Sequence, residues 1–266
     1  LICKILSIKI ITRSNSFPDD WTKSNFKKFL FKTIYKMADV RIVNSIGSKK
    51  RFLKHYNLSS VCIYNPLNLK EIINLSEIKK KNLFNNKVSL KLISVGRLSQ
   101  EKDQLTFLKS ILYLKNKINL SALIMGEGLL KKKLLEFIKK NKLNKIVKLT
   151  GYKKNPYPHI KHSNFLILTS LHEGLPNILL EAMALKKFVI SSNCETGPRE
   201  ILLNGKAGAL FKVKNYIELS NKILFFHKNK KIRNKKIKFG YSKINRFDRR
   251  KNLQKYYKII SILINK

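Results

Sequence analysis

The sequence is short of acidic residues. It has 15 Asp and Glu against 57 Lys and Arg, which gives a formal net charge of +42 over 266 residues. Cysteine is also scarce, because only Cys3, Cys62 and Cys194 occur, without the spacing of a metal site or a disulfide framework. Such usage fits a reducing compartment, so we expect a cytoplasmic protein. No apolar run approaches the roughly 20 residues that span a bilayer, so no transmembrane helix is expected in this stretch of chain.

Several motifs that carry chemistry are absent from the sequence. There is no Asp-x-Asp pair to hold a divalent cation on a diphosphate, no Walker loop and no Gly-x-Ser-x-Gly. His159 and His162 have a spacing that could bind a metal, but no Cys or carboxylate stands near them in the sequence. We therefore expect neither a metal nor a cofactor, and any bound diphosphate must be neutralised by basic residues and a helix N-terminus.

We expect the chain to be a fragment, on the evidence of its first residue. The sequence starts at Leu1 rather than at Met. Residues 1–11 are mostly apolar but carry Lys4 and Lys9, and they lack the small-residue cleavage site of a signal peptide. We expect this stretch to form a core element.

The basic residues leave two interpretations open. Only nine of the 57 are arginine, and the lysines are spread over the whole chain. One interpretation is attraction to an anionic membrane surface, and the other is the coding bias of an AT-rich genome. Nucleic acid is not expected as a partner, because the sequence has neither a known binding motif nor aromatic residues interleaved on a basic face.

Short apolar runs alternate with helical patterns from residue 88 onward. Amphipathic helices are predicted over 103–118 and 129–141. Buried strands are predicted over 90–96, 120–126, 145–151, 164–170 and 188–193. This alternation indicates an α/β fold with a doubly wound parallel sheet, in which ligands bind at the carboxyl ends of the strands.

The first 80 residues look like the last part of a second α/β unit. The predicted elements are a helix over 26–38, a strand over 39–45, a helix over 47–57 and a strand over 60–68. Residues 70–87 are polar and charged with few turn signals, so we expect a linker there. The end of the chain shows helical periodicity again.

The loops after the predicted strands hold groups suited to a phosphate. Arg97 and Lys102 follow the strand at 90–96 and stand beside a helix N-terminus. An arginine fork, a lysine charge and free backbone N–H groups together make a pyrophosphate site. Gly126 and Gly128 follow the next strand, where the backbone can approach a ligand closely. The third glycine of the dinucleotide fingerprint is missing.

Two of the scarce carboxylates bracket the segment "HEGLPNILLE". Pro176 is favoured at the first position of a helix, so Glu173 falls in the preceding loop and Glu181 about one turn into the helix. Both would face the crevice at the strand ends, where one carboxylate can hold a sugar and the other a ribose. The alternative is that Glu173 is an ordinary residue near a helix N-terminus and Glu181 a solvated helix residue.

Four segments, in this order, resemble one enzyme family. "VGRLSQEKD", "MGEG", "HEGLPNILLEA" and "TGPREIL" are similar to the donor domain of retaining glycosyltransferases of the GT-B fold, family four, also called group one. The similarity covers roughly residues 88–260. The segment "TGPREIL" looks most like members that build bacterial surface polysaccharides, often from UDP-hexoses or UDP-N-acetylhexosamines.

The resemblance implies a role for each matching residue. Arg97 and Lys102 would bind the donor diphosphate and act in catalysis together with Glu173, which would contact the transferred sugar. Glu181 would hold the ribose hydroxyls. The other residues implied around the nucleotide-sugar are Gly126, Glu127, Gly128, Gly151, Tyr152, Gly174, Leu175, Pro176 and Asn177.

The resemblance also implies a domain plan and an activity. Residues 1–85 would be the end of an acceptor domain plus a linker, residues 86–245 the donor domain, and residues 246–266 a helix packing back toward the N-terminal domain. The chain would be an N-terminally truncated retaining glycosyltransferase. It would transfer a sugar from a nucleotide-sugar donor, expected to be UDP-linked, to a glycan or lipid-linked acceptor without a metal.

Two expectations about this activity stay open. Acceptor-side catalytic groups are expected upstream of Leu1, so the alternative is a nucleotide-sugar-binding fragment without turnover. A lipid-linked acceptor, together with the lysine-rich surface, would fit peripheral attachment to the inner face of the cell membrane.

Overall fold

The computed structural model describes residues 6–17, 20, 22, 24–85 and 87–265. Its larger part is built on a six-stranded sheet in which every neighbouring pair of strands is parallel. In spatial order the strands are β6 (Val147–Leu149), β5 (Leu120–Met125), β4 (Leu90–Val95), β7 (Phe165–Leu168), β8 (Phe188–Ser192) and β9 (Ala209–Phe211). The five strands predicted from the sequence are all present, and β9 is an addition.

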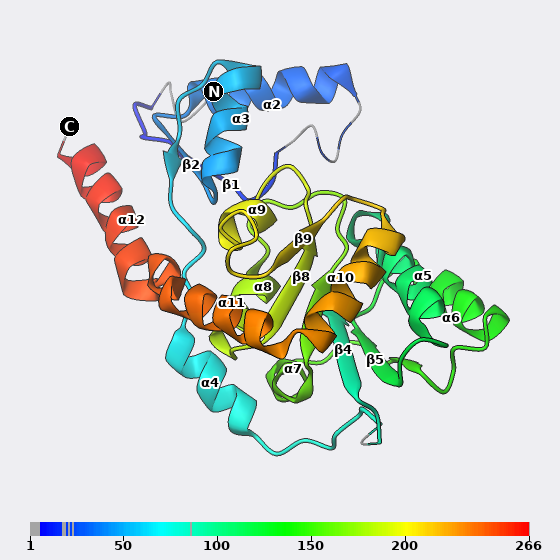
Figure 1. Cartoon of the computed structure of the whole chain (residues 1–266). Helices are drawn as coiled ribbons and strands as arrows, with labels where there is room; N and C mark the ends of the chain where they lie inside the picture. The colour runs from blue at the N-terminus through cyan, green and yellow to red at the C-terminus, as the bar shows by residue number, and fades with distance from the viewer. Residues whose placement is uncertain (1–5, 18–19, 21, 23, 86, 266) are drawn as a thin grey trace.

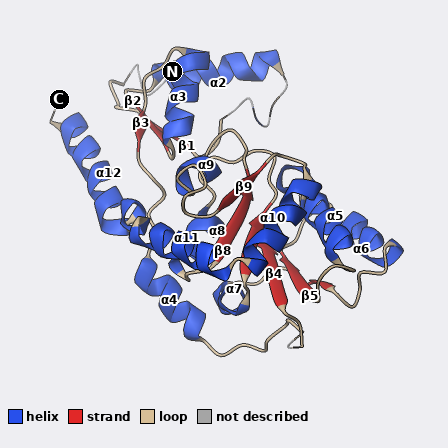
Figure 2. Cartoon of the chain, viewed as in Figure 1, coloured by secondary structure: helices blue, strands red, loops and turns tan. Residues whose placement is uncertain are grey.

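Helices cover both faces of this sheet, which confirms the doubly wound α/β fold (Figures 1 and 2). One face carries α5 (Gln104–Leu114), α6 (Lys131–Lys140) and α10 (Tyr216–Lys228), and the other carries α7 (Tyr157–His162), α8 (Asn177–Ala184) and η3 (Ile244–Phe247). Successive side chains of β7 enter opposite cores, Phe165 on the first face and Leu166 on the second. A strand buried on both faces is therefore apolar throughout. The elements η2 (Gln100–Lys102), α9 (Pro198–Ile201) and α11 (Lys230–Ser242) complete this part.

The smaller, N-terminal part has a parallel sheet of three strands. Their order is β1 (Ile11–Ser14), β2 (Val40–Val43) and β3 (Val61–Cys62), and they are joined by α2 (Asn25–Met37) and α3 (Ile46–Tyr56). The side chain of Ser45 caps α3 by accepting the N–H of Ser48. The rings of Phe17 and Phe52 pack edge to face, 5.3 Å apart, in a small aromatic core. The helices and strands predicted here are confirmed, although the last strand is much shorter than the predicted 60–68.

The prediction of a linker over residues 70–87 is wrong for its first half. Helix α4 (Leu69–Glu77) begins after Asn68, whose side chain accepts the N–H of Glu71. Ile72 is buried in the core that α7 and α8 share. The charged residues lie on the outer face of an amphipathic helix. The high proportion of charged residues in this segment therefore concealed the few residues that the helix buries.

The opening stretch of the chain was expected to form a core element. Residues 1–5 lie outside the described part of the chain. Leu6 and Ile8 are 62% and 51% exposed. The expectation is therefore wrong for these two residues.

The C-terminal helix α12 (Arg249–Ile264) leaves the larger part of the molecule and reaches the smaller one (Figure 1). The hydroxyl of Tyr256 accepts a hydrogen bond of 2.7 Å from Nε of Arg13 in β1. Just before the helix, the N–H of Leu67 donates to the carbonyl oxygen of Phe247 at 2.8 Å. The domain boundaries expected at residues 85 and 245 stay predictions.

A single carboxylate also joins the two parts. Glu200, in α9, accepts hydrogen bonds from the backbone N–H groups of Ile46 (3.0 Å) and Gly47 (3.3 Å) at the start of α3. It also accepts one from the hydroxyl of Tyr64 at 2.6 Å. The first N–H groups of a helix have no partner within the helix, and a negative charge there is favoured by the helix dipole. Glu200 therefore acts as a cap that one part of the molecule supplies to the other.

We expect Glu200→Ala to lower the free energy of unfolding by about 1–3 kcal/mol, because it removes the acceptor of two helix N–H groups and one hydroxyl. Urea unfolding followed by circular dichroism measures this change. Glu200→Gln keeps one acceptor oxygen and should cost less. Glu195, whose side chain is 61% exposed in the loop before α9, supplies the control, and Glu195→Gln should change the free energy by less than about 0.5 kcal/mol. Equal stability of Glu200→Ala and the parent would contradict the capping role.

Candidate functional site

The order of the large sheet reverses between β4 and β7. From β4 the chain continues outward through β5 and β6, whereas β7, β8 and β9 follow on the other side. In open parallel sheets, ligands bind at the carboxyl ends of the strands at such a point. Arg97 follows β4 and Glu173 follows β7, so residues singled out in the sequence stand on both sides of this crevice.

Backbone hydrogen bonds join the loops after β4, β5 and β6 into one surface. The N–H of Leu98 donates to the carbonyl oxygen of Glu127 at 2.8 Å, and the N–H of Gly126 donates to that of Gly151 at 3.0 Å. A Cβ added to Gly126 would lie 1.9 Å from the carbonyl oxygen of Gly96, so no larger residue fits there. The close approach of these loops requires this glycine whatever ligand lies above it.

Two cavities open onto this surface, and both include Arg97 in their walls. The first, called here the Lys102 cavity, has a volume of about 400 Å³. Its walls are Asn15, Ser16, Asp20, Arg97, Glu101, Lys102, His172, Glu173 and Gly174. The second, called the Glu181 cavity, has a volume of about 490 Å³. Its walls are Val95, Gly96, Arg97, Met125, Gly126, Glu127, Tyr152, Lys153, Lys154, Pro156, Tyr157 and Glu181.

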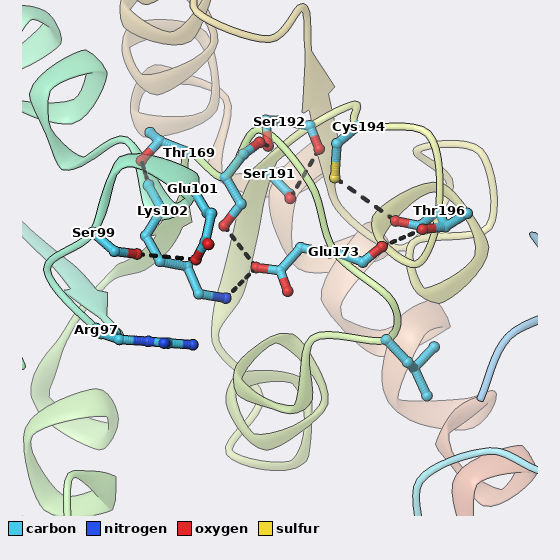
Figure 3. A network of polar contacts seen from close by, with 12 residues as sticks. Arg97, Ser99, Glu101, Lys102, Thr169, Glu173, Ser191, Ser192, Cys194 and Thr196 are labelled. Atoms are coloured by element: carbon cyan, nitrogen blue, oxygen red, sulfur yellow. Dashed lines mark hydrogen bonds and ion pairs between the residues drawn. The ribbon is translucent and has the colours of Figure 1, made fainter. Parts of the chain in front are cut away.

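An ion pair forms part of the wall of the Lys102 cavity (Figure 3). Nζ of Lys102 lies 2.5 Å from Oε1 of Glu173, and the hydroxyl of Ser170 donates to the same oxygen at 2.6 Å. The side chain of Glu173 is only 9% exposed. The sequence suggested separate ligand groups for the two residues, whereas the structure joins them directly. A diphosphate that approaches Lys102 must therefore compete with the Glu173 carboxylate for the ammonium group.

Hydroxyl groups fix the backbone on both sides of this ion pair (Figure 3). Oγ1 of Thr169 donates to the carbonyl oxygen of Lys102 at 2.8 Å, and the hydroxyl of Thr196 donates to that of Glu173. These bonds connect the loops after β4, β7 and β8. The positions of the ammonium and the carboxylate are thus set by three rigid strand ends, as a preorganised site requires.

Arg97 stands exposed between the two cavities. Its carbonyl oxygen accepts a hydrogen bond of 2.7 Å from the side-chain amide of Gln104, which is buried at the start of α5. Within the described part of the chain, no ion pair involves its guanidinium. A planar fork of donors at this boundary can bind an anion that extends from one cavity into the other.

Glu181 lines the second cavity from α8. Burial raises the pKa of its carboxyl group to about 7. Tyr157 lines the same cavity, and burial, followed by the charge of Glu181, raises the pKa of the phenol to about 12. Near neutral pH the Glu181 carboxyl is therefore present in both forms, and its charged form can accept hydrogen bonds from two hydroxyls.

Three residues that the sequence placed around the donor line neither cavity. Leu175 and Pro176 lie just before α8, Asn177 is the first residue of that helix, and both Leu175 and Asn177 contact the smaller part of the molecule. The side-chain amide of Asn65 donates to the carbonyl oxygen of Leu175 at 3.1 Å and to Oδ1 of Asn177 at 2.6 Å. These residues orient α8 rather than border the cavities.

The remaining predicted residues divide into two groups. Glu127 and Tyr152 line the Glu181 cavity from its outer edge, Glu127 in an exposed ion pair of 3.0 Å with Lys131 and Tyr152 with 71% of its surface exposed. Gly128 and Gly151 are absent from both walls, and a Cβ on Gly128 would lie 2.4 Å from the carbonyl oxygen of Leu98. The absence of a side chain at Gly128 and Gly151 lets the neighbouring loops approach each other closely.

The smaller part contributes wall residues that the sequence did not indicate. Asn15, Ser16 and Asp20 follow β1 and line the Lys102 cavity, and His172 joins them from the loop after β7. A Cβ added to Gly174 would lie 1.7 Å from the carbonyl oxygen of Asn15, so the two loops touch directly. No local pattern could reveal a contact between segments more than 150 residues apart in the chain.

Among the residues that the structure describes, no group of three or more His, Cys, Asp or Glu could hold a metal ion. No helix in the same residues has both the length and the apolar character needed to cross a membrane. Attachment to an anionic membrane surface stays a prediction.

The chain is similar in sequence to known glycosyltransferases. It is 39% identical to an uncharacterized glycosyltransferase of Methanocaldococcus jannaschii over 181 residues, which are 65% of this chain and 44% of that protein. It is 31% identical over 204 residues to the N-acetylgalactosamine-N,N'-diacetylbacillosaminyl-diphospho-undecaprenol 4-alpha-N-acetylgalactosaminyltransferase of Campylobacter jejuni, covering 73% of this chain and 53% of that one. The chain thus spans about half the length of the curated relatives it matches.

Solved structures share the fold at low sequence identity. The crystal structure of Anabaena HepE in complex with UDP matches with a TM-score of 0.82 and 18% identity, over 97% of this chain and 74% of that one. Staphylococcus aureus TarM matches with a TM-score of 0.77 and 19% identity, over 97% of this chain and 51% of that one. These similarities confirm the GT-B-like arrangement of two α/β parts.

A family model described as "Glycosyl transferases group 1" matches residues 76–243. The matched stretch contains Arg97, Lys102, Glu173 and Glu181. It also contains all six strands of the large sheet. The resemblance that four short segments indicated is confirmed, and the chain belongs to the glycosyl transferases group 1 family.

Proposed function

We propose that the chain carries the donor site of a retaining glycosyltransferase that acts in surface polysaccharide synthesis. The donor is a UDP-linked hexose or N-acetylhexosamine, and the acceptor is a glycan or lipid-linked glycan. One observation carries the proposal: two adjoining cavities share Arg97, one with an ammonium–carboxylate pair and the other with a buried carboxyl group. The Campylobacter relative, named for transfer to a diphospho-undecaprenol-linked sugar, and the HepE complex with UDP and glucose support it.

The proposed donor extends across both cavities. The nucleoside occupies the Glu181 cavity, where the carboxylate accepts the ribose hydroxyls. The diphosphate lies along Arg97 and displaces Glu173 from Lys102. The sugar then enters the Lys102 cavity beside the Glu173 carboxylate that has been released.

The proposed chemistry needs stabilisation of charge at two points. As the bond between the anomeric carbon and the diphosphate breaks, negative charge grows on the phosphate oxygens near Arg97 and Lys102, while positive charge grows on the sugar near Glu173. The acceptor hydroxyl attacks the same face that the diphosphate leaves, so the configuration is retained. Its proton passes to the departing diphosphate. No metal is invoked, because the two cations supply the positive charge.

We expect Arg97→Ala to weaken UDP binding by about 1.5–3 kcal/mol, since a charge-assisted fork to the diphosphate is lost. Lys102→Ala should weaken it less, because in the parent part of the binding energy is spent in separating Lys102 from Glu173. Isothermal titration calorimetry measures both. Lys133, an exposed residue of α6 that lines neither cavity, supplies the control, because Lys133→Ala removes the same charge outside both walls. Unchanged UDP affinity in both site variants would place the donor elsewhere.

The alternative is a nucleotide-sugar-binding chain without turnover. A thermal-shift screen of UDP-, GDP- and ADP-sugars identifies the donor. Release of UDP from that donor is then followed with and without added glycan acceptors. Binding with no release under any condition would favour the alternative.

A further inference from the structure

The Lys102 cavity has two chemically different sides. Arg97 and Lys102 border it from the larger part, where the diphosphate and the transferred sugar are proposed to lie. Asp20, from the smaller part, and His172, from the loop after β7, also border it. The donor arrangement proposed above assigns no role to these last two residues. Three of the 15 acidic residues of the chain line this one cavity, namely Asp20, Glu101 and Glu173, and of these Asp20 comes from the smaller part.

Asp20 is held firmly in place. Its side chain is 8% exposed, and Oδ2 lies 2.9 Å from NH1 of Arg51. The guanidinium of Arg51 is itself fixed, because it lies 4.2 Å above the centre of the buried Phe17 ring and 3.5 Å from Glu195. The carboxylate of Asp20 therefore has one oxygen bound to the protein and keeps a defined orientation toward the cavity.

The other oxygen of Asp20 is placed to share a ligand with His172. Oδ1 lies 3.8 Å from Nδ1 of His172, which is too long for a direct hydrogen bond. Two atoms 3.8 Å apart can both lie about 2.8 Å from one hydroxyl oxygen, which is the usual length of a hydrogen bond. A single hydroxyl group can therefore bind to Asp20 and His172 at once. The imidazole is 47% exposed and can turn to meet such a group.

The charges select the kind of ligand. A phosphate is attracted to Arg97 and Lys102 but repelled by the carboxylate of Asp20. A neutral sugar brings hydroxyl groups that donate to a carboxylate and accept from an imidazole. The loop contact between Gly174 and Asn15 holds this side of the cavity against the Glu173 side. A sugar hydroxyl bound to Asp20 would therefore lie in the same cavity as the proposed donor sugar.

We propose that Asp20 and His172 bind the acceptor sugar and hold its attacking hydroxyl toward the anomeric carbon, an inference that rests on the function proposed above. Asp20 accepts the hydrogen bond of the hydroxyl, and His172 bridges to its oxygen. In the transfer step the bond between the anomeric carbon and the diphosphate breaks, the hydroxyl oxygen forms the new bond to that carbon, and the hydroxyl proton turns from Asp20 to the departing phosphate oxygen, so Asp20 orients the group without keeping the proton. The described chain thus includes acceptor-side groups, although the sequence suggested that these lie upstream of Leu1.

The experiment compares two carboxylates that both contact Arg51. Asp20→Asn keeps one oxygen for Arg51 and removes the charge that faces the cavity. Glu195→Gln changes the other acidic partner of Arg51, which does not line the Lys102 cavity. His172→Gln, at an exposed position, tests the second side of the subsite without a risk to folding. The donor is UDP-N-acetylgalactosamine, and the acceptor probe is N-acetylgalactosamine linked through a diphosphate to a short polyprenyl chain.

We expect Asp20→Asn to raise the KM for the acceptor probe about 10- to 100-fold, as the loss of a hydrogen bond to a charged group does. The Kd for UDP and the rate of donor hydrolysis by water should stay within about twofold of the parent, and His172→Gln should raise the acceptor KM by a smaller factor. Glu195→Gln should match the parent in all three measurements. A purely structural role of Asp20 would lower UDP binding and hydrolysis together with transfer.

Each contrary result has a defined meaning. Equal losses in the Asp20 and Glu195 variants would show that Asp20 serves only Arg51, which overturns the subsite. A parent that binds and hydrolyses the donor but is indifferent to the acceptor probe also overturns it. A parent that binds no UDP at all instead overturns the proposed function, so the two failures are distinguishable.

Discussion

Glu173→Gln is expected to lower kcat by about 10²–10³ without weakening UDP binding. In the structure Glu173 holds the ammonium of Lys102 at 2.5 Å. Gln in its place would hold that ammonium less strongly, so Lys102 would be more available to the diphosphate and UDP affinity should stay equal or rise. The carboxylate that faces the developing positive charge of the sugar would be lost, which costs a rate factor of about 10²–10³ for one transition-state contact. A lower kcat with equal or tighter nucleotide binding is the signature of this role.

Steady-state kinetics with the donor and calorimetry with UDP provide the two measurements. Glu101 borders the same cavity, but its side chain is exposed and accepts a hydrogen bond of 3.3 Å from the hydroxyl of Ser99, so Glu101→Gln is the matched control and should leave both values unchanged. Circular dichroism and melting curves must first agree with the parent. An unchanged kcat in Glu173→Gln would remove Glu173 from the chemistry, and weaker UDP binding would mean that its carboxylate assists the diphosphate site rather than competing with it.

Much of the large sheet could be predicted because its strands are buried on both faces. The apolar run of β7 has no polar interruption, and a loop and a helix follow it, which is the pattern of a doubly wound sheet. Strand β9 has only three residues, Ala209–Phe211, and a run of that length does not differ from an apolar turn. Helix α4 was missed for a different reason, since its single buried stripe is hidden among charged residues.

The site was only partly predictable for a related reason. Arg97, Lys102, Glu173 and Glu181 were found because they follow strands, and strand ends in a parallel sheet meet at one edge. The ion pair between Lys102 and Glu173 depends on β4 and β7 being neighbours, which the sequence order does not state. The cavity wall formed by the smaller part depends on a contact between segments that are still farther apart in the sequence, at Asn15 and Gly174. The sequence therefore indicated candidate residues but not the distances between their side chains, and the roles of these residues stay predictions.

Glu181→Gln is expected to stabilise the protein above neutral pH. Burial raises the pKa of this carboxyl from the usual 4.5 to about 7. Between these pH values the folded protein binds more protons than the unfolded chain, so the free energy of unfolding falls as the pH rises from 4.5 through 7. Above pH 7 the full cost of the buried charge is present, up to about 3 kcal/mol. Glu181→Gln removes that cost, so its free energy of unfolding should exceed that of the parent by up to this amount at pH 8.

The difference between variant and parent should shrink as the pH falls toward 4.5, because the parent carboxyl is then neutral as well. Urea unfolding at a series of pH values measures it, and other titrating groups cancel because they are common to both proteins. Glu136→Gln, on the exposed face of α6, should show no pH-dependent difference. A difference that does not vary with pH would contradict the buried charge.

The same substitution should weaken UDP binding, by about 1–2 kcal/mol at pH 8, because an amide oxygen accepts ribose hydroxyls less strongly than a carboxylate. At pH 6 the parent carboxyl is largely protonated, so the ratio of the two affinities should be several-fold smaller than at pH 8. The ionisation of UDP itself cancels in this ratio. Equal ratios at pH 6 and pH 8 would mean that the ribose is not held by Glu181. A variant that is both more stable and weaker in binding would instead show that the buried charge serves the ligand and opposes the fold, as expected of a residue placed for function.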